Sequence, residues 1–365
     1  MSTSQQPLCF KARFRMGVCL RPLLILAIMF IGSGVGLGQD QRPSPPAPEG
    51  IIDVAGYFTA YDNWQHAIVC NGGKFYEIFF DPNRGLFQAS LGRFPDIVAI
   101  AAEFAPADAR RQNIIAVSRT GSIYYIHFIP GFPVYFNAIE KIKGVVDVAA
   151  FYSDDTEIQR AVLATSSGDI IELEWRSGCG LDPCRVFRKT TLTNIPGARH
   201  VAGFFTRDDR YNIVLVSTSG GDVYEIYYKT PDRIGKSIIA SYSNIIDVAG
   251  FYTDDDQLRH AIIGTGDGTI HEVFYNPRVG KASTPLLTVP GLTHVAGYAT
   301  TDAPGNHWRH VIASTSAGEV KEVYYDPAKG VWITTLRSYS PEFAQGVTPS
   351  EKTAIEVTRA GPRRH

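Results

Sequence analysis

The chain has 365 residues, and 35 Lys and Arg against 36 Asp and Glu give a formal net charge of −1. Hydrophobic residues make up 44% and charged residues 19%, which is ample material for a large core. This balance excludes a strongly basic nucleic-acid binder and a highly charged disordered chain. With 34 Gly, 22 Pro, 18 Tyr and 20 Phe, the composition favours many short strands and turns over long helices.

The first 38 residues predict a secretory signal peptide. Residues 1–21 contain four basic residues and no acidic residue, and the apolar run 22–31 follows them. The small-residue stretch GSGVGLG then ends at Gly38, which completes the usual order of such a signal. The apolar run is short and followed by glycines, so we expect no membrane span after cleavage. The mature protein is then expected to be secreted or periplasmic.

Cysteine usage agrees with export. Cys9 and Cys19 belong to the signal, so three cysteines remain in the mature chain. Cys179 and Cys184 lie close together in the segment RSGCGLDPCR, which predicts a small disulfide ring in an oxidising compartment. Cys70 lies in an apolar run and is expected to be a buried free thiol. No pair of histidines accompanies these cysteines, so they do not predict a metal site.

The rest of the chain consists of two terminal segments and a repetitive body. Residues 39–50, QDQRPSPPAPEG, form a proline-rich linker, and residues 341–365 are expected to form a flexible tail. Between them, residues 51–340 contain six units that open on segments such as IIDVAGYF and IIDVAGFY. One aligned apolar position gives Val54, Ile100, Val148, Val201, Val248 and Val295, in steps of 46, 48, 53, 47 and 47. The long step contains the cysteine segment, which we therefore expect in a loop.

Each unit has the same internal order. A strand-like run such as DVAGFYT is followed by a polar loop, a second run that turns at glycine, a third run and a weaker fourth. Four short strands repeated at this period are typical of a propeller blade. Small residues such as Ala249 and Gly250 place the first strand innermost, where blades crowd the axis. The sequence therefore predicts an all-β, six-bladed β-propeller with four-stranded antiparallel blades. A linear solenoid needs polar capping units, which neither end offers.

A basic residue and a glutamate recur on the second and third strands. The pairs are Arg160–Glu172, His260–Glu272 and His310–Glu322, twelve residues apart, and His66–Glu77, eleven residues apart. Unit four has Ile213 and Glu225 in these places, and unit two has Asn113 and Tyr125. For a hairpin that turns near residues 316–318, we expect residues 310 and 322 to lie opposite one another on one face. Such a pair offers a donor and an acceptor to adjacent sugar hydroxyls.

An aromatic residue stands three positions after each third-strand residue of this pattern. The six are Phe80, Phe128, Trp175, Tyr228, Tyr275 and Tyr325. This layout resembles the fungal fucose-specific lectins related to the orange-peel-mushroom agglutinin, which are six-bladed propellers. The resemblance implies that a sugar sits between blades, held by the basic residue and the glutamate against an aromatic ring of the next blade. The implied sites are Arg160 and Glu172 with Tyr228, His260 and Glu272 with Tyr325, and His310 and Glu322 with Phe80.

The chain also departs from that family. Only Arg160 keeps the arginine, and the family's tryptophan after the third strand has Trp332 as its one near counterpart. A general glycan-binding role therefore follows more directly than a preference for fucose. Several weak sites on a rigid ring would gain strength through multivalency. The alternative is structural, with cross-strand polar pairs and aromatics that fill gaps between blades.

A second set of polar residues stands just before the aligned apolar position. They are Asp53, Asp147, His200, Asp247 and His294, while unit two has Ala99. Near the mouth of a central channel, such a ring could bind a metal or serve acid–base chemistry in a propeller-type hydrolase or lactonase. Equally, these residues could be strand ends that face water. The loops after the first strands are rich in Asp, as turns are, and lack the spacing of a calcium loop.

The sequence contains no nucleophile elbow, P-loop or zinc-protease motif. It therefore predicts an exported, non-catalytic propeller that binds glycans or glycoconjugates, needs no cofactor and binds no nucleic acid. The alternatives are an enzyme that uses the Asp/His ring and a protein-interaction scaffold that uses the rim loops. The identity of the sugar, the number of working sites and the oligomeric state stay open.

Overall fold

The structure is a computed structural model. It describes residues 50–59, 61–81, 84–104, 111–129, 133–176, 186–276, 280–303, 306–326, 329–339 and 358–359. All of them belong to the compact unit Pro46–His365. The expected signal peptide, most of the linker, and Cys179 and Cys184 with their expected disulfide lie outside the described residues. Within these residues, no helix has the length and apolar character needed to cross a membrane.

The described strands form six antiparallel sheets, five of four strands and one of five, and the strands of each sheet are consecutive in the chain. Blades 1 and 2 comprise β1 (Ile51–Thr59), β2 (Trp64–Asn71), β3 (Lys74–Asp81), β4 (Gly85–Arg93), β5 (Ile97–Phe104), β6 (Gln112–Ser118), β7 (Ser122–Phe128) and β8 (Tyr135–Lys141). Blades 3 and 4 comprise β9 (Val145–Ser153), β10 (Ile158–Thr165), β11 (Asp169–Arg176), β12 (Arg188–Asn194), β13 (Ala198–Thr206), β14 (Tyr211–Thr218), β15 (Asp222–Tyr228) and β16 (Ile234–Ser241). Blades 5 and 6 comprise β17 (Ile245–Thr253), β18 (Leu258–Thr265), β19 (Thr269–Asn276), β20 (Gly280–Thr288), β21 (Leu292–Ala303), β22 (Asn306–Thr315), β23 (Glu319–Asp326) and β24 (Gly330–Ser338).

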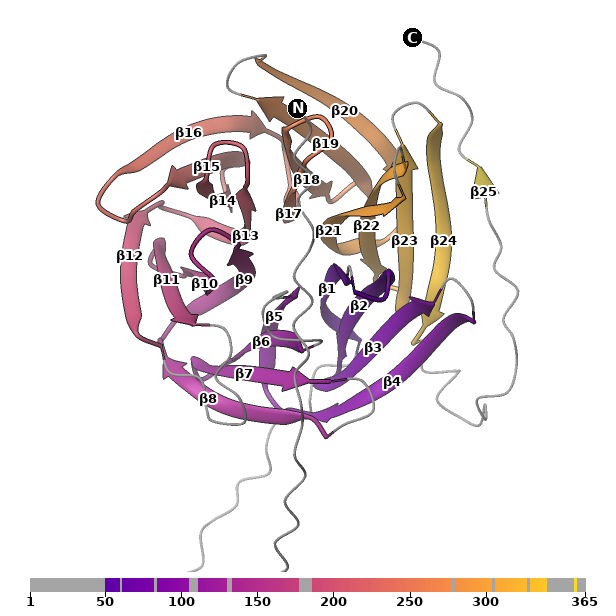
Figure 1. Cartoon of the computed structure of the whole chain (residues 1–365), viewed down its shortest axis with the longest axis horizontal. Coiled ribbons are helices and arrows are strands. Elements are labelled where there is room, and N and C mark those ends of the chain that lie inside the picture. The colour runs from indigo at the N-terminus through magenta and orange to yellow at the C-terminus, as the bar shows by residue number, and fades with distance from the viewer. Residues whose placement is uncertain are drawn as a thin grey trace, which may run out of the picture. The chain divides into compact units, whose positions relative to one another are not determined.

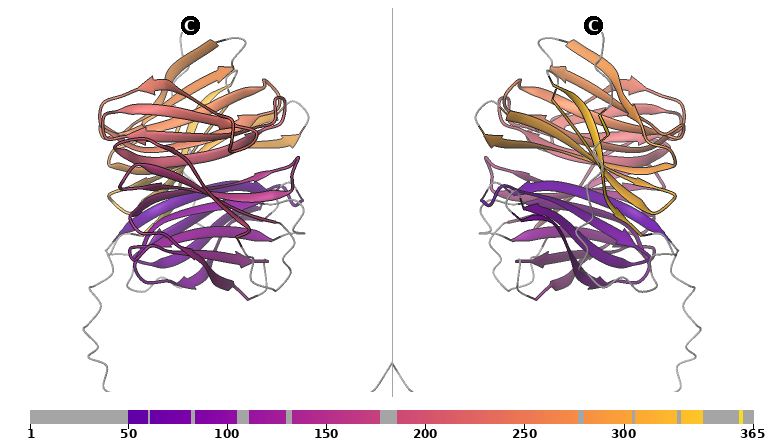
Figure 2. Two further views of the ribbon diagram at one scale, coloured as in Figure 1. Left: turned by 90° about the vertical axis from the view of Figure 1, so that its left-hand side faces the viewer. Right: turned by 90° about the vertical axis from the view of Figure 1, so that its right-hand side faces the viewer.

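The six sheets surround a common axis, which confirms the predicted six-bladed propeller. The first strand of each blade lies nearest the centre and the fourth strand forms the outer edge (Figure 1). Seen from the side, the strands of each blade run between the two faces of the ring (Figure 2). In blade 6 a short fifth strand, β25 (Thr358–Arg359), pairs with β24.

Small residues on the innermost strands let neighbouring blades approach each other. A Cβ atom on Gly203 would lie 2.5 Å from the Phe151 ring of the preceding blade. The same relationship closes the ring, because a Cβ atom on Gly56 in blade 1 would lie 2.9 Å from the Tyr298 ring in blade 6. The prediction that the small-residue strand is innermost is therefore confirmed, and its cause is side-chain packing between blades.

The core lies between the blades, and the second strands are its most buried elements. Every residue of β6 is buried, for example, and so are seven of the eight in β10. Cys70, on β2, is a buried free thiol as expected, and burial raises its pKa to about 12. Aspartates in the loops after the first strands stabilise turns. Asp62 accepts hydrogen bonds from the Thr59 hydroxyl and the Trp64 amide, which confirms the turn interpretation there.

Candidate functional site

The structure brings together all four predicted pairs of a basic residue and a glutamate. The Nδ1 to Oε1 distance is 2.8 Å for His66–Glu77, 2.8 Å for His260–Glu272 and 2.9 Å for His310–Glu322. The Nε atom of Arg160 lies 3.1 Å from Oε1 of Glu172. The repeated spacing in the sequence thus marks a repeated side-chain contact within each of these blades.

The register of this contact differs from the sequence expectation. His310 is paired with Tyr324, and Glu322 is paired with Ile312, so His310 and Glu322 are diagonal neighbours on one face and do not lie opposite one another. The reason is the turn, in which the Gly318 amide bonds to the Thr315 carbonyl and Gly318 has a φ of 78°. The hairpin is therefore centred on residue 317, so that residue 310 meets residue 324 and not residue 322.

The histidines are fixed by further contacts. The second ring nitrogen of His260 lies 2.8 Å from the Thr253 hydroxyl, and its ring stacks on Phe251 at a centroid distance of 4.9 Å. His66 has the same two kinds of contact, with Thr59 and Tyr57. All four pairs are buried inside the junctions between blades, with exposed fractions from 0% for His260 to 8% for Glu322.

In blades 3, 4 and 5 a tyrosine of the next blade adds a hydrogen bond to the glutamate. The Tyr325 hydroxyl donates to Glu272 at 2.6 Å, and the Tyr275 hydroxyl donates to Glu225 at 3.0 Å. The Tyr228 hydroxyl donates to Glu172. Each of these tyrosines bonds to Oε1 of the glutamate. These three junctions form closed, buried networks that join one blade to the next.

Blades 1 and 6 differ, because the residue in the place of this tyrosine is a phenylalanine. At the junction after blade 1 this residue is Phe128 of blade 2. At the junction after blade 6, which closes the ring, it is Phe80 of blade 1. Neither ring has a hydroxyl, so Glu77 and Glu322 receive no such bond from the next blade. Glu322 instead accepts a 3.1 Å hydrogen bond from Tyr298 of its own blade.

In the same two blades, a cluster of aromatic rings lies beside the His–Glu pair, nearer to the surface. In blade 6, Trp332 lies 5.3 Å from Trp308 and 5.8 Å from Tyr324 between ring centroids, and the Lys329 ammonium lies 5.0 Å from the Trp308 ring. In blade 1 the corresponding residues are Trp64, Phe79, Phe87 and Arg84. The rings are half-buried or exposed, unlike the pairs beside them. We call these sets the blade-6 and blade-1 aromatic clusters.

Apart from Trp332, the sequence analysis missed these clusters, although a signal was present. Tryptophan stands two residues before the histidine only in units one and six, as Trp64 and Trp308. Residues two apart on a strand share a face, so each tryptophan had to lie on the histidine side of its blade.

A second missed series stands one residue before the aligned second-strand position that holds the basic residue in four units, Asn113 in unit two and Ile213 in unit four. It is polar in all six units, as Gln65, Gln112, Gln159, Asn212, Arg259 and Arg309. Several of these side chains reach back to the preceding blade. The Arg259 guanidinium donates to Glu225 at 2.7 Å, and Asn212 accepts a 2.8 Å hydrogen bond from Ser153. Arg259 thereby supplies the cation that unit four lacks on its own second strand.

The charges of blade 3 are strongly affected by burial. Arg160 lies between Glu172 and Glu174, at 3.1 and 3.2 Å, and Arg188 also pairs with Glu174. Burial raises the pKa of Glu172 to about 7, and the hydrogen bond from Tyr228 and the Arg160 charge oppose this rise. The pKa of Glu225 in blade 4 is raised by the same cause.

The Asp/His ring lies at the central channel, which contains a cavity of about 120 Å³ lined by Asp53, Asp147 and Asp247. These aspartates are not strand ends that face water. Each accepts the amide of the next residue and an amide of the following blade, so that Asp53 bonds to Val54 and to Ile100, both at 2.8 Å. Asp147 and Asp247 do the same toward blades 4 and 6.

The titration of this ring is shifted by burial. Burial raises the pKa of Asp53 to about 7 and raises the pKa values of Asp147 and Asp247 well above their usual range. Burial also lowers the pKa values of His200 and His294 to about 4, so both imidazoles are neutral at physiological pH.

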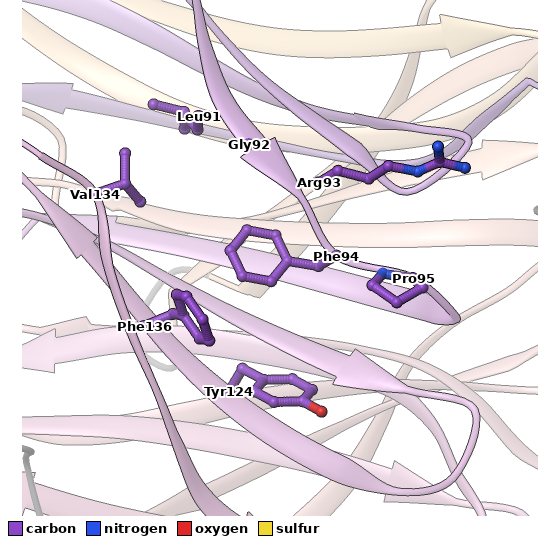
Figure 3. Close-up of a pocket in the computed structure, with 8 residues that line it drawn as sticks. All are labelled: Leu91, Gly92, Arg93, Phe94, Pro95, Tyr124, Val134 and Phe136. Carbon is purple, nitrogen blue, oxygen red and sulfur yellow. The ribbon is translucent and has the colours of Figure 1, made fainter. Parts of the chain in front are cut away.

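A separate hollow lies between blades 1 and 2, away from all the predicted site residues. It has a volume of about 370 Å³ and is lined by the end of β4 and by β7 and β8. Figure 3 shows Phe94 facing Phe136 and Tyr124 across it, while Arg93 points away. The Phe94 and Phe136 rings meet edge to face at 5.2 Å. Because the Arg93 guanidinium points outward, the lining of this hollow is mainly apolar.

Comparison with known proteins gives no matching family model and no matching curated protein. Solved structures do match. AofleA from Arthrobotrys oligospora superposes with a TM-score of 0.61 and 14% identity over 79% of this chain and 86% of that chain. The fungal lectin of Aleuria aurantia gives 0.58 and 11% over 77% and 93%, and the BP39L lectin from Burkholderia pseudomallei gives 0.53 and 14% over 76% and 82%. The resemblance found in the sequence is thus confirmed in the fold, and this chain shares the six-bladed propeller of these lectins.

Proposed function

We propose that this protein is a non-catalytic, carbohydrate-binding propeller whose sugar sites are formed by the aromatic clusters of blades 6 and 1 with their His–Glu pairs. The observation that carries the proposal is the difference between the junctions. Where the next blade supplies a tyrosine, the glutamate is closed off, and where it supplies phenylalanine, a half-buried aromatic cluster adjoins the pair.

The chemistry of the blade-6 cluster suits a sugar. Aromatic rings cover the C–H face of a pyranose, while a carboxylate and a cation bind its hydroxyls. Trp332 and Tyr324 are nearly parallel, with an angle of 11° between their planes, and Trp308 stands at 68° to both. Glu322 is the most exposed of the paired glutamates. Lys329 adds a donor at the outer side.

In this proposal the pairs Arg160–Glu172 and His260–Glu272 are not the principal sugar sites. Their partners Tyr228 and Tyr325 each donate a hydrogen bond to one carboxylate oxygen inside the buried junction. They act mainly as ties between blades, and a sugar would have to displace a tyrosine to reach them. The site of His310 and Glu322 with Phe80 becomes the principal one, and His66 with Glu77 contributes the second.

Two further lines support a lectin-like role. The structure of the Aleuria aurantia lectin is described by its fucose recognition mode, and the SapL1 lectin was solved with alpha methyl fucoside. The order of charges, apolar run and small residues in 1–38 fits export to a compartment where glycans are displayed. Two sites on one rigid ring would strengthen binding to a multivalent glycan surface.

A glycan array with the purified protein tests this function. We expect sugar-dependent binding that falls at least tenfold in Trp332→Ala and further in the Trp332→Ala, Trp64→Ala double variant. The reason is that stacking of a ligand ring on one aromatic side chain contributes about 1–3 kcal/mol, as it does for nucleobases. Phe187→Ala is the matched control, because it removes another exposed aromatic ring outside both clusters. A folded protein that binds no glycan, or binding that both tryptophan variants retain in full, would refute the proposal.

A further inference from the structure

The central channel holds donor atoms spaced for a metal ion. Asp147 and Asp247 come from blades 3 and 5, and His200 comes from blade 4 between them. Nδ1 of His200 lies 3.5 Å from Oδ1 of Asp247 and 3.8 Å from Oδ2 of Asp147. One donor atom from each of the three residues lies within 4.8 Å of the others.

These separations are long for hydrogen bonds, whose N···O distances are about 2.7–3.2 Å. They match the edges of a metal coordination sphere instead. Two ligands bound at about 2.1 Å to a tetrahedral Zn²⁺ ion stand about 3.4 Å apart. The imidazole nitrogen thus faces two carboxylates across a gap that fits an ion and is too wide for a shared proton.

The carboxylates are held in place by the fold. Each oxygen of Asp147 accepts one backbone amide, from Val148 or from Val201, and each oxygen of Asp247 accepts one from Val248 or from Val295. A carboxylate oxygen has a second lone pair, so both aspartates retain donor capacity toward the channel. Backbone bonds of this kind fix the direction of metal ligands.

The aspartates in the channel also lack a basic partner other than histidine among the described residues. Asp53, Asp147 and Asp247 all line the same cavity. Among the described residues, no lysine or arginine forms an ion pair with any of the three. Buried carboxylates are ordinarily paired or bound to a metal. The imidazole of His200 lies beside both Asp147 and Asp247, and imidazole is a common metal ligand.

We propose that Asp147, His200 and Asp247 bind one divalent transition-metal ion of the Zn²⁺ type in the central channel, where it ties three consecutive blades together. The donor set of two carboxylates and an imidazole favours Zn²⁺ or Co²⁺ over the all-oxygen sites that Ca²⁺ and Mg²⁺ prefer. Asp53 and His294 hold the equivalent positions in blades 1 and 6 and add one more carboxyl and one more imidazole to the ring. This site is separate from the proposed sugar sites at the blade junctions.

The test measures Zn²⁺ itself on the purified protein with any affinity tag removed. We expect about one Zn²⁺ per chain by elemental analysis, a higher melting temperature with Zn²⁺ that a chelator reverses, and a visible spectrum of coordinated Co²⁺. His200→Ala should lower Zn²⁺ affinity at least about tenfold. Alanine is acceptable at this ring position, because blade 2 has Ala99 there. His271→Ala, which removes a half-buried histidine on β19, should leave Zn²⁺ binding unchanged.

The Co²⁺ spectrum is recorded on the unmodified protein, so it does not depend on how the variants fold. Absence of bound Zn²⁺ and of any Co²⁺ spectrum would overturn the proposal. So would Zn²⁺ binding that is equal in His200→Ala and in the unmodified chain. Glycan binding is measured alongside, and its loss in the tryptophan variants with intact Zn²⁺ binding separates the two sites.

Discussion

The hydroxyl of Tyr325 in blade 6 donates a 2.6 Å hydrogen bond to the carboxylate of Glu272 in blade 5. Both side chains are buried, and the same carboxylate accepts from His260 on its own blade. The bond is therefore a polar tie across an otherwise apolar junction. Where the corresponding residue is a phenylalanine, as Phe80 is beside Glu322, this bond from the next blade is missing.

Tyr325→Phe removes this tie without changing the shape of the ring. We expect the free energy of unfolding to fall by about 1–2 kcal/mol, since the buried carboxylate loses one hydrogen bond. Urea denaturation measures the change as a shift in midpoint at constant slope. Tyr324→Phe is the control, because Tyr324 lies half-buried in the blade-6 aromatic cluster and should change stability by much less. Equal effects of the two substitutions would contradict the assigned role of Tyr325.

Phe80→Tyr introduces at the ring closure the hydroxyl that Tyr325 supplies in the preceding junction. The new hydroxyl should reach Glu322 and compete with a sugar for it. We expect glycan binding to fall several-fold while the melting temperature stays level or rises. Phe187→Tyr adds a hydroxyl at a ring that is 53% exposed and should change neither quantity. Unaltered glycan binding in a stabilised Phe80→Tyr protein would show that Glu322 does not take part.

Glu172→Gln tests the raised pKa of the blade-3 carboxyl. Burial raises this pKa from 4.5 to about 7. The folded protein therefore holds a proton that the unfolded chain has lost between these values, and stability falls as the pH rises through this window. The glutamine variant lacks this titration. The unmodified protein should lose about 2–3 kcal/mol relative to the variant from about pH 4.5 to about pH 8.

The measurement is urea denaturation of both proteins across that pH range. Glu319→Gln serves as the control, because the Glu319 side chain is 37% exposed and its substitution should give a nearly flat difference. A Glu172→Gln difference that is equally flat would mean that Arg160 and Tyr228 offset the cost of burial completely.

Gly203→Ala tests the packing of the innermost strands. Its Cβ atom would lie 2.5 Å from the Phe151 ring, so the ring or the strand must move. We expect a loss of about 1–3 kcal/mol, as for other overpacked sites. At Gly220 the nearest atom to an added Cβ is 3.6 Å away, so Gly220→Ala should stay within about 0.5 kcal/mol. Thermal and urea unfolding measure both, and equal stability of the two variants would exclude crowding at the axis.

The sequence predicted several features because they depend on local periodicity. Six units with four strand-like runs each indicated the propeller, and small residues such as Gly250 indicated the innermost strand. The constant spacing of twelve residues between His260 and Glu272 predicted a contact, because a hairpin fixes which residues meet across it. The exact register was missed, because the spacing alone does not fix the centre of the turn, and His260 pairs with Phe274 instead of Glu272.

Other features depend on which blade faces which, and local pattern does not contain that information. Whether Glu272 or Glu322 is closed off depends on a residue of the next blade, and for Glu322 this is Phe80, at the opposite end of the repeat array. The side chains of Asp53, Asp147 and Asp247 line one cavity although they come from blades 1, 3 and 5, far apart in the chain.

The sequence by itself thus determined the repeat, the blade, the order of strands and the contact within each hairpin, because these depend on residues close together in the chain. The tertiary structure decided burial, the ties between blades and the geometry of the channel. The physical reason is that burial and hydrogen-bond partners are set by the packed neighbour. In a closed ring that neighbour is a separate blade whose side chain, Tyr or Phe, changes the chemistry of an otherwise identical site.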